Sequence, residues 1–213
     1  MTINENITSR RVLRCGLDEA GRGPMAGPVC AAAVILPERF DLSLLDDSKK
    51  LNARRREEAM RAIYAQSLAW CVGWASPEEI DAINILAASL LAMKRAYEGL
   101  FRALGTLSAE ELDPSSIDVI VDGLHKPDIA ARTVQAEPRA DGTYAEVMAA
   151  SILAKTARDR MMERYSWLYP EYGYERHKGY PTAAHIRALK ENGPSPIQRK
   201  TFRLKGEGQL TLF

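Results

Sequence analysis

The sequence is poor in cysteine, and it lacks the long apolar runs that a membrane span needs. Its three cysteines, Cys15, Cys30 and Cys71, are odd in number and show no C-x-x-C spacing. They lie in apolar, strand-like segments, which favours reduced thiols in a cytoplasmic protein over disulfides or a zinc site. The first eleven residues are polar, and no apolar run approaches the roughly 18 residues of a membrane helix. The sequence thus argues against secretion and membrane insertion.

Two common kinds of functional motif are also missing. The loop Gly21-Arg22-Gly23 is not a dinucleotide-binding fingerprint, because G-x-G-x-x-G would need a glycine at Ala26. The three histidines, His125, His177 and His185, have neither zinc spacing nor a spacing that enforces an acid–base pair. We expect structural or solvent-exposed histidines, with His177 the first exception.

Net charge is close to zero, but the charges are unevenly distributed. The chain carries 29 Lys or Arg and 28 Asp or Glu, for a formal charge of +1. Residues 155–205 hold 12 basic and 5 acidic residues, a local +7, so the remainder totals −6. Such segregation suits a protein that grips a polyanion with one end and holds cations with the other. A solvated basic helix face is the alternative.

Length and periodicity predict an α/β protein. With 213 residues and 46% hydrophobic content, the chain fits one catalytic domain over 1–205. A basic helical region is expected over about 165–205, and a flexible tail over 206–213. Strands are predicted over 12–17, 29–36, 68–75, 117–123 and 133–136, and helices over 53–67, 76–104, 143–165 and 181–191. We expect a monomer with a mixed five-stranded sheet flanked by helices, built from three strands followed by βα crossovers.

Acidic residues end two of the predicted strands. Asp18 and Glu19 close the first strand, and Asp122 closes the fourth. If these strands lie side by side and parallel, about 4.8 Å apart, Asp18 and Asp122 converge, and Glu19 and Asp141 could complete the set. Two such charges 4 Å apart repel by about 4 kcal/mol at an effective dielectric near 20. An ionised cluster therefore needs divalent cations, and all-oxygen ligands suit Mg²⁺ or Mn²⁺.

Six segments in order resemble the bacterial ribonuclease HII family, the type 2 ribonucleases H. They are Asp18-Glu19-Ala20-Gly21-Arg22-Gly23-Pro24, Asp47-Ser48-Lys49-Lys50-Leu51, Val121-Asp122-Gly123, Ala150-Ser151-Ile152-Leu153-Ala154-Lys155, Arg158-Asp159 and His177-Lys178-Gly179-Tyr180-Pro181-Thr182. The resemblance implies a ribonuclease H-like fold. It also implies hydrolysis of the ribonucleotide-containing strand of RNA/DNA hybrids, and of duplex DNA that carries a single embedded ribonucleotide, in replication and repair.

The resemblance also assigns site residues. The catalytic metal ligands are Asp18, Glu19, Asp122 and Asp141. The family often has Lys-Gly-Asp before the last acid, whereas this chain reads Arg139-Ala140-Asp141. Asp159 is the competing candidate, although its place on a helix between two arginines suits a structural ion pair.

Substrate recognition is expected to depend on the 2′-OH, the group that separates a ribonucleotide from its DNA neighbours. The resemblance assigns this reading to Gly21, Arg22 and Gly23, with Tyr180 stacking near the junction; a half-buried core tyrosine is the alternative. Candidate phosphate contacts are Lys49, Lys50, Lys178, Arg199 and Lys200.

The last five residues, Gln209-Leu210-Thr211-Leu212-Phe213, resemble the bacterial sliding-clamp-binding motif. The residues that match its pattern are Gln209, Leu210, Leu212 and Phe213. A sliding clamp is thus an expected partner, and a locally packed apolar tail is the alternative. An adaptor that keeps this fold without cutting is the rival function, and the complete set of carboxylates argues against it.

Overall fold

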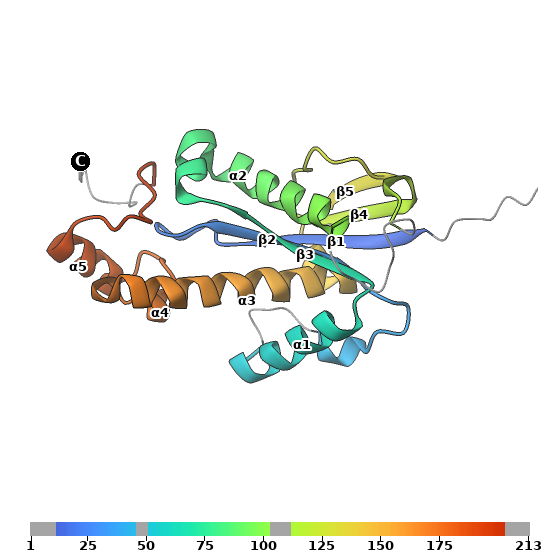
Figure 1. The fold of residues 1–213 in the computed structure, drawn as a ribbon, viewed down its shortest axis with the longest axis horizontal. Coiled ribbons are helices and arrows are strands. Elements are labelled where there is room, and N and C mark those ends of the chain that lie inside the picture. The colour runs from blue at the N-terminus through green and yellow to red at the C-terminus, as the bar shows by residue number, and fades with distance from the viewer. Residues whose placement is uncertain (1–11, 46–50, 103–111, 203–213) are drawn as a thin grey trace, which may run out of the picture.

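A five-stranded mixed sheet forms the centre of the molecule (Figure 1). The computed structural model describes residues 12–45, 51–102 and 112–202. Its strands are β1 (Leu13–Ala20), β2 (Val29–Ile35), β3 (Ala69–Ala75), β4 (Ile117–Asp122) and β5 (Thr133–Glu137). Their order across the sheet is β3-β2-β1-β4-β5. The first three strands pair antiparallel, whereas β4 runs parallel to both β1 and β5. The predicted strands and the mixed sheet are confirmed.

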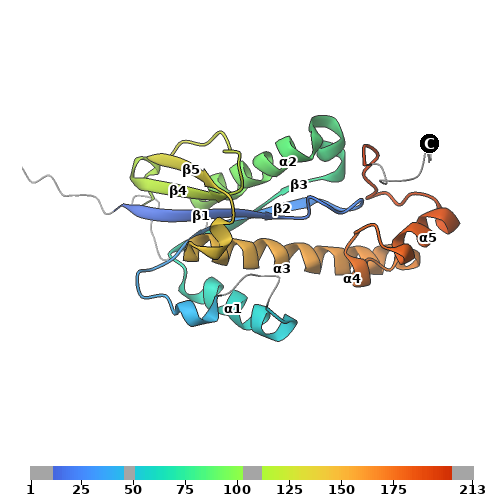
Figure 2. The same ribbon diagram turned by 180° about the vertical axis from the view of Figure 1, so that it is seen from behind.

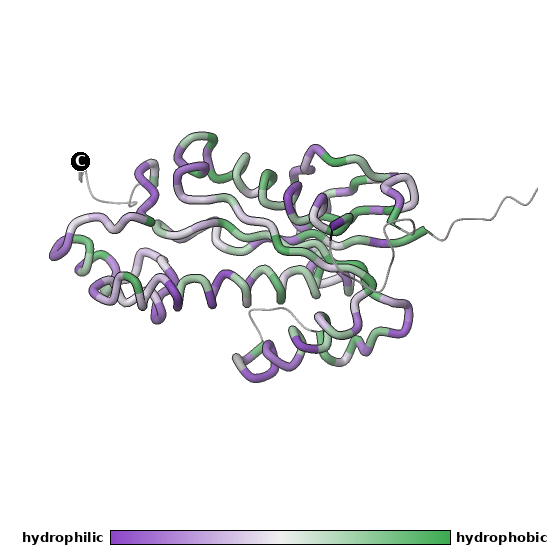
Figure 3. Tube along the Cα trace, viewed as in Figure 1, coloured by the Kyte–Doolittle hydropathy of each residue, from purple (hydrophilic) through white to green (hydrophobic). Residues whose placement is uncertain are grey.

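Helices cover both faces of the sheet. They are α1 (Ala53–Gln66), α2 (Pro77–Leu100), α3 (Ala145–Leu168), α4 (Tyr174–His177) and α5 (Ala183–Asn192), with short 3₁₀ turns η1 (Leu42–Leu44), η2 (Pro114–Ser116), η3 (Ala140–Gly142) and η4 (Pro170–Tyr172). Helix α2 lies on one face, and α1 and α3 lie on the other (Figures 1 and 2). Alternate residues of a strand face opposite sides, so Cys15 and Leu17 join the core under α2. Cys30 and Ala32 join the core under α1 and α3, and apolar segments line the inside of both layers (Figure 3).

Two details differ from the predicted elements. The connection from β4 to β5, residues 123–132, contains no helix, so the expected βα crossover is wrong there. Helix α2 is interrupted at Asn84, whose backbone is non-helical (φ 68°, ψ 165°). The Asn84 side chain accepts hydrogen bonds from the N–H groups of Leu86 (3.0 Å) and Ala87 (3.1 Å), and so caps the second half of the helix.

The C-terminal region packs at the far end of α3 (Figure 1). Turn η4 and helices α4 and α5 surround a small core that includes Met162, Tyr174 and Leu189. Met25 and Ala26, from the loop that follows β1, belong to the same core. The glycine-rich loop is thus held between the sheet and the C-terminal region. Within the ranges described, no helix combines the length and the apolar character needed to cross a bilayer.

Candidate active site

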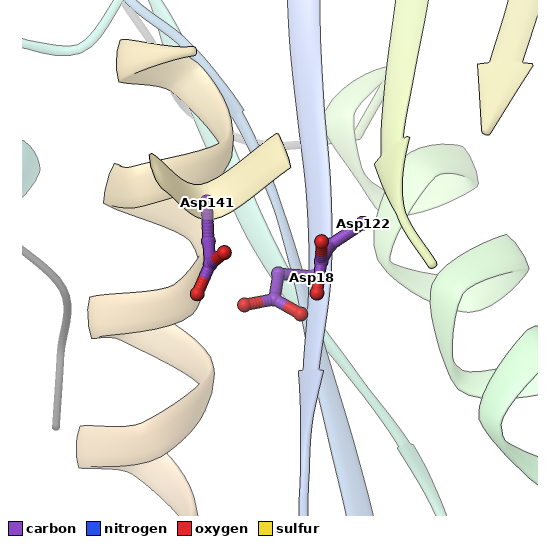
Figure 4. Close-up of side chains that lie close together, drawn as sticks. All are labelled: Asp18, Asp122 and Asp141. Atoms are coloured by element: carbon purple, nitrogen blue, oxygen red, sulfur yellow. The ribbon is translucent and has the colours of Figure 1, made fainter. Parts of the chain in front are cut away.

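Three aspartates meet at the carboxyl ends of β1 and β4. The parallel register pairs Leu17 with Val121, which brings the next residues, Asp18 and Asp122, to the same level. Turn η3 adds Asp141 just before α3. One carboxylate oxygen from each aspartate lies within 4.8 Å of the others (Figure 4). The predicted convergence of Asp18, Asp122 and Asp141 is therefore observed.

Backbone hydrogen bonds hold the turn that carries Asp141. Arg139 adopts a left-handed backbone conformation (φ 64°), which reverses the chain after β5. The following N–H, that of Ala140, donates to Asp122 Oδ1 at 2.9 Å. The backbone N–H groups of Arg139 and Asp141 also donate hydrogen bonds to this carboxylate. Through these hydrogen bonds to turn η3, Asp122 holds Asp141 in its place in the cluster.

Burial and like charges raise the pKa of two of the three carboxyls. The pKa of Asp18 lies well above its ordinary value, first because the group is buried and then because Glu19 is nearby. Hydrogen bonds from the Ser151 hydroxyl and the Glu19 N–H (2.7 Å) partly stabilise the charged form. Burial, followed by the charge of Asp141, raises the pKa of Asp122. The chain thus concentrates negative charge where water screens it poorly.

Glu19 lies outside this three-carboxylate cluster in the described residues. Adjacent residues of a strand point to opposite faces, so Glu19 cannot follow Asp18 toward α3. Its carboxylate lies 3.5 Å from Arg22 instead. The expected four-acid set is therefore observed as three close carboxylates with Glu19 beside them.

Asp159, the alternative to Asp141, is also outside the cluster in the described part of the chain. It forms an ion pair with Lys155 at 2.8 Å, one helical turn away on α3. The predicted structural role fits this contact, although the partner is neither of the adjacent arginines. Arg158 is buried, and Arg160 pairs with Glu57.

The glycine-rich loop lies against the exposed Tyr180 ring. A side-chain methyl group at Gly23 would lie 3.3 Å from Tyr180 Cε1. Tyr180 is 43% exposed, so its ring is accessible rather than enclosed in the core. Gly21 has a positive φ (103°), and a methyl group there would overlap the Arg158 side chain. Both glycines thus allow close approach, each to a different side chain.

The proposed phosphate contacts differ in availability. Lys178 is paired with Glu163 at 2.7 Å, and Lys200 is exposed. Lys49 and Lys50 lie outside the described residues, as do Gln209, Leu210, Leu212 and Phe213.

Arg199 is not a phosphate contact, which corrects the sequence-based prediction. Its side chain is 1% exposed. The guanidinium donates to the carbonyl oxygens of Gly21 (2.6 Å), Arg22 (3.1 Å), Pro24 (2.7 Å) and Gly27 (2.8 Å). A buried guanidinium that donates four hydrogen bonds to the protein's own backbone cannot reach a nucleic-acid phosphate.

Two histidines that the sequence did not pair lie stacked. The rings of His177 and His185 are 4.6 Å apart and nearly parallel. Burial lowers the pKa of both. His177 contacts the Tyr172 carbonyl (2.9 Å), and His185 contacts the Tyr180 carbonyl (3.0 Å). These contacts support the predicted structural role, including for His177.

Ser151 is the site residue for which the sequence analysis gave no role. It is a polar residue in the buried run Ala149–Ala154 of α3, and it hydrogen-bonds Asp18. A lone hydroxyl in an otherwise apolar helix segment is the signal that could have identified it, because buried polar groups need partners.

The sequence matches the Ribonuclease HII family over residues 15–205. The chain belongs to the ribonuclease HII family. It is 59% identical to a ribonuclease HII of Treponema denticola over 90% of this chain and 98% of the relative. It is 45% identical to one from Bacteroides thetaiotaomicron over 96% of each.

Solved structures agree with this assignment. A complex of PCNA and RNase HII from Archaeoglobus fulgidus matches with a TM-score of 0.66 and 28% identity, over 95% of this chain and 100% of that one. The ribonuclease H2 from Pyrococcus horikoshii matches with a TM-score of 0.65 and 28% identity, over 89% and 93%. The ribonuclease H-like fold is confirmed. The protein is a metal-dependent endoribonuclease that acts on RNA/DNA hybrids.

Proposed function

We propose that Asp18, Asp122 and Asp141, with Glu19 beside them, bind two Mg²⁺ or Mn²⁺ ions and direct hydrolysis next to a ribonucleotide. The observation that carries this proposal is the set of three carboxylate oxygens within 4.8 Å, two of them from groups with a raised pKa. All-oxygen donors with uncompensated negative charge fit a hard divalent cation. Bound ions would supply the positive charge that activates a water and stabilises the leaving oxygen.

The protein's own contribution is to hold the oxygens in place. The Ser151 hydroxyl orients Asp18, and the backbone of turn η3 orients Asp122. No side-chain nucleophile is required, because water attacks the phosphorus. The products are then a 3′-hydroxyl and a 5′-phosphate.

The loop Gly21-Arg22-Gly23 is proposed to read the 2′-OH, which would extend the activity to single ribonucleotides in duplex DNA. Arg22 and Gly23 are exposed, and Gly23 has no side chain to obstruct a sugar. Tyr180 lies beside Gly23 with an exposed ring that could stack at the junction.

Substitution of the carboxylates tests the metal assignment. Asp122→Asn should reduce cleavage at least about a hundredfold in saturating Mg²⁺ or Mn²⁺, while duplex binding is retained because repulsion of the phosphate falls. Asp159→Asn is the matched control and should cleave at nearly the wild-type rate. Comparable rates for Asp122→Asn and wild type would contradict the assignment. Loss of activity in Asp159→Asn, together with normal activity in Asp141→Asn, would identify Asp159 and not Asp141 as the fourth metal ligand.

A bacterial sliding clamp is the proposed protein partner. The support is the resemblance of Gln209-Leu210-Thr211-Leu212-Phe213 to a clamp-binding motif. A relative of 28% identity has been solved in complex with PCNA. The proposed contact is an extended tail whose Leu212 and Phe213 enter an apolar pocket on the clamp.

A further inference from the structure

The guanidinium of Arg199 lies beneath the glycine-rich loop. Its four hydrogen bonds, between 2.6 and 3.1 Å, all go to backbone carbonyls of residues 21–27. The side chain is buried, and the ring of Phe202 lies 4.9 Å from the guanidinium carbon. A planar guanidinium, with five N–H donors on three nitrogens, can hold four carbonyls in one fixed arrangement, whereas an ammonium has only three donors on a single atom.

This arrangement determines where the loop's N–H groups point. A trans peptide directs its C=O and the following N–H to opposite sides, and the described residues contain no cis peptide. Because the carbonyls of Gly21 and Arg22 face Arg199, the N–H groups of Arg22 and Gly23 face away from it. Neither N–H donates to a backbone carbonyl within the described residues, and both residues are exposed. Two neighbouring donors are thus turned outward.

The segment around Arg199 is itself anchored. The Arg199 N–H donates to the Met25 carbonyl at 2.9 Å. On the other side, Asp81 of α2 accepts hydrogen bonds from the N–H groups of Lys200 and Thr201, each at 2.9 Å. Helix α2, the C-terminal segment and the loop therefore form one connected unit.

We propose that Arg199 is a positioning residue for ribonucleotide discrimination, because its guanidinium holds the carbonyls of residues 21–24 so that the Arg22 and Gly23 N–H groups face the substrate. This inference rests on the proposed function of the loop in reading the 2′-OH. Arg199 itself touches neither the substrate nor the metal ligands; it acts through the loop.

The test is the preference of the protein for a ribonucleotide. Full-length variants are titrated by fluorescence anisotropy with two duplexes of identical sequence, one all-DNA and one with a single ribonucleotide. Ca²⁺ replaces Mg²⁺, and a gel confirms that the duplexes remain intact. The readout is the ratio of the two dissociation constants, which a uniform loss of folded protein does not change.

Arg199→Lys should reduce this preference by about tenfold, the factor that one lost hydrogen bond to a substrate hydroxyl produces. Affinity for the all-DNA duplex should be unchanged. Arg95→Lys is the control, because Arg95 also donates to a backbone carbonyl, that of Trp74 (2.7 Å), and its other partner, Glu79, lies outside the loop as well. It should retain the preference. An unchanged ratio in Arg199→Lys, or an equal loss in Arg95→Lys, would overturn the inference.

Two further variants complete the design. If Arg199→Lys does not fold, Asp81→Asn tests the inference in its place. This variant weakens the anchoring of the segment that carries Arg199 and should reduce the preference for a ribonucleotide. An unchanged ratio of dissociation constants would overturn the inference. Gly23→Ala distinguishes a failure of the role of Arg199 from a failure of the role of the loop. If Gly23→Ala loses the preference and Arg199→Lys keeps it, only the inference fails. If both variants keep it, or if wild type has no preference, the proposed function of the loop fails.

Discussion

At the scale of single residues, the carboxylate cluster is arranged for a cation that the polypeptide does not supply. Asp18 is 5% exposed, yet its carboxylate lies beside those of Asp122 and Asp141. Two unit charges 4.8 Å apart repel by about 3.5 kcal/mol at an effective dielectric near 20. Hydrogen bonds from Ser151 and the Ala140 N–H offset part of this cost. A divalent ion would offset the rest, so stability and metal binding should be coupled.

We expect Asp18→Asn to raise the melting temperature of the metal-free protein by a few degrees, because one buried charge is removed. The same variant should lose the further stabilisation that wild type gains on addition of Mg²⁺. Thermal unfolding in EDTA and in Mg²⁺ measures both effects. Asp159→Asn is the control and should keep the Mg²⁺ response. A normal Mg²⁺ response in Asp18→Asn would show that Asp18 does not hold the ion.

The stacked histidines make stability sensitive to acid. Burial lowers the pKa of His177 and His185 below the ordinary 6.5, so the unfolded chain binds protons that the folded protein does not. The free energy of unfolding should therefore lose nothing to these two histidines above pH 6.5. It should fall as the pH drops below 6.5, by up to about 1.4 kcal/mol per pH unit for each proton.

Urea unfolding at pH values of about 7 and 5.5 tests this prediction. His185→Gln should flatten the pH dependence, whereas His125→Gln should leave it as in wild type, because His125 is exposed. Parallel pH profiles for wild type and His185→Gln would contradict the assignment.

At the scale of elements, the site depends on the close approach of α3 to β1. A methyl group at Gly16 would lie 2.1 Å from the Glu146 carbonyl carbon at the start of α3. Gly73 has a similar contact on the other face, 2.2 Å from the Ala92 carbonyl oxygen of α2. These contacts involve backbone atoms, so neither neighbour can avoid a larger residue by changing its rotamer.

Gly16→Ala and Gly73→Ala should each destabilise the protein by about 1–3 kcal/mol or more through overpacking. Only Gly16→Ala should also weaken Mg²⁺ binding, because displacement of α3 moves Ser151 away from Asp18. Urea unfolding gives the first effect, and calorimetric Mg²⁺ titration gives the second. Equal Mg²⁺ affinities in the two variants would mean that the position of α3 does not control the site.

The helices and strands that carry local periodicity could be predicted from the sequence. Strand-end positions correctly placed Asp18 beside Asp122, because parallel strands end at one edge. The same alternation also explains why Glu19 turns away from Asp18. Arg199 was misread because its partners lie more than 170 residues earlier in the chain, and a basic, irregular segment shows no periodicity that indicates burial. The stacking of His177 on His185 is likewise a product of tertiary packing.

At the scale of the whole molecule, the basic C-terminal region has fewer free cations than its sequence indicates. Arg158 and Arg199 are buried, while Lys155, Arg160 and Lys178 are in ion pairs. The exposed cations that remain along residues 155–202 include Arg164, Arg187, Lys190 and Lys200. Binding of a polyanion by this region therefore remains a prediction, and it depends on this smaller set of exposed cations.

Deletion of residues 209–213 should remove binding to a bacterial sliding clamp and leave cleavage of short duplexes unchanged. Burial of Leu212 and Phe213 could contribute about 1.5 to 3 kcal/mol each, offset in part by ordering of the tail. The expected affinity is about micromolar. A titration in which full-length and truncated proteins bind the clamp equally would refute the motif.

We propose that the aspartate cluster, with metal ions, directs water at a phosphodiester next to a ribonucleotide. The most direct measurement is mass spectrometry of the products when a duplex with one ribonucleotide is cleaved in ¹⁸O-labelled water. Attack by water gives a 5′-phosphate that carries one solvent oxygen and a 3′-hydroxyl on the other fragment, and Asp122→Asn should form both products at least about a hundredfold more slowly. A 2′,3′-cyclic phosphate with an unlabelled 5′-hydroxyl on the other fragment would show that the 2′-OH is the nucleophile and would rule out attack by water.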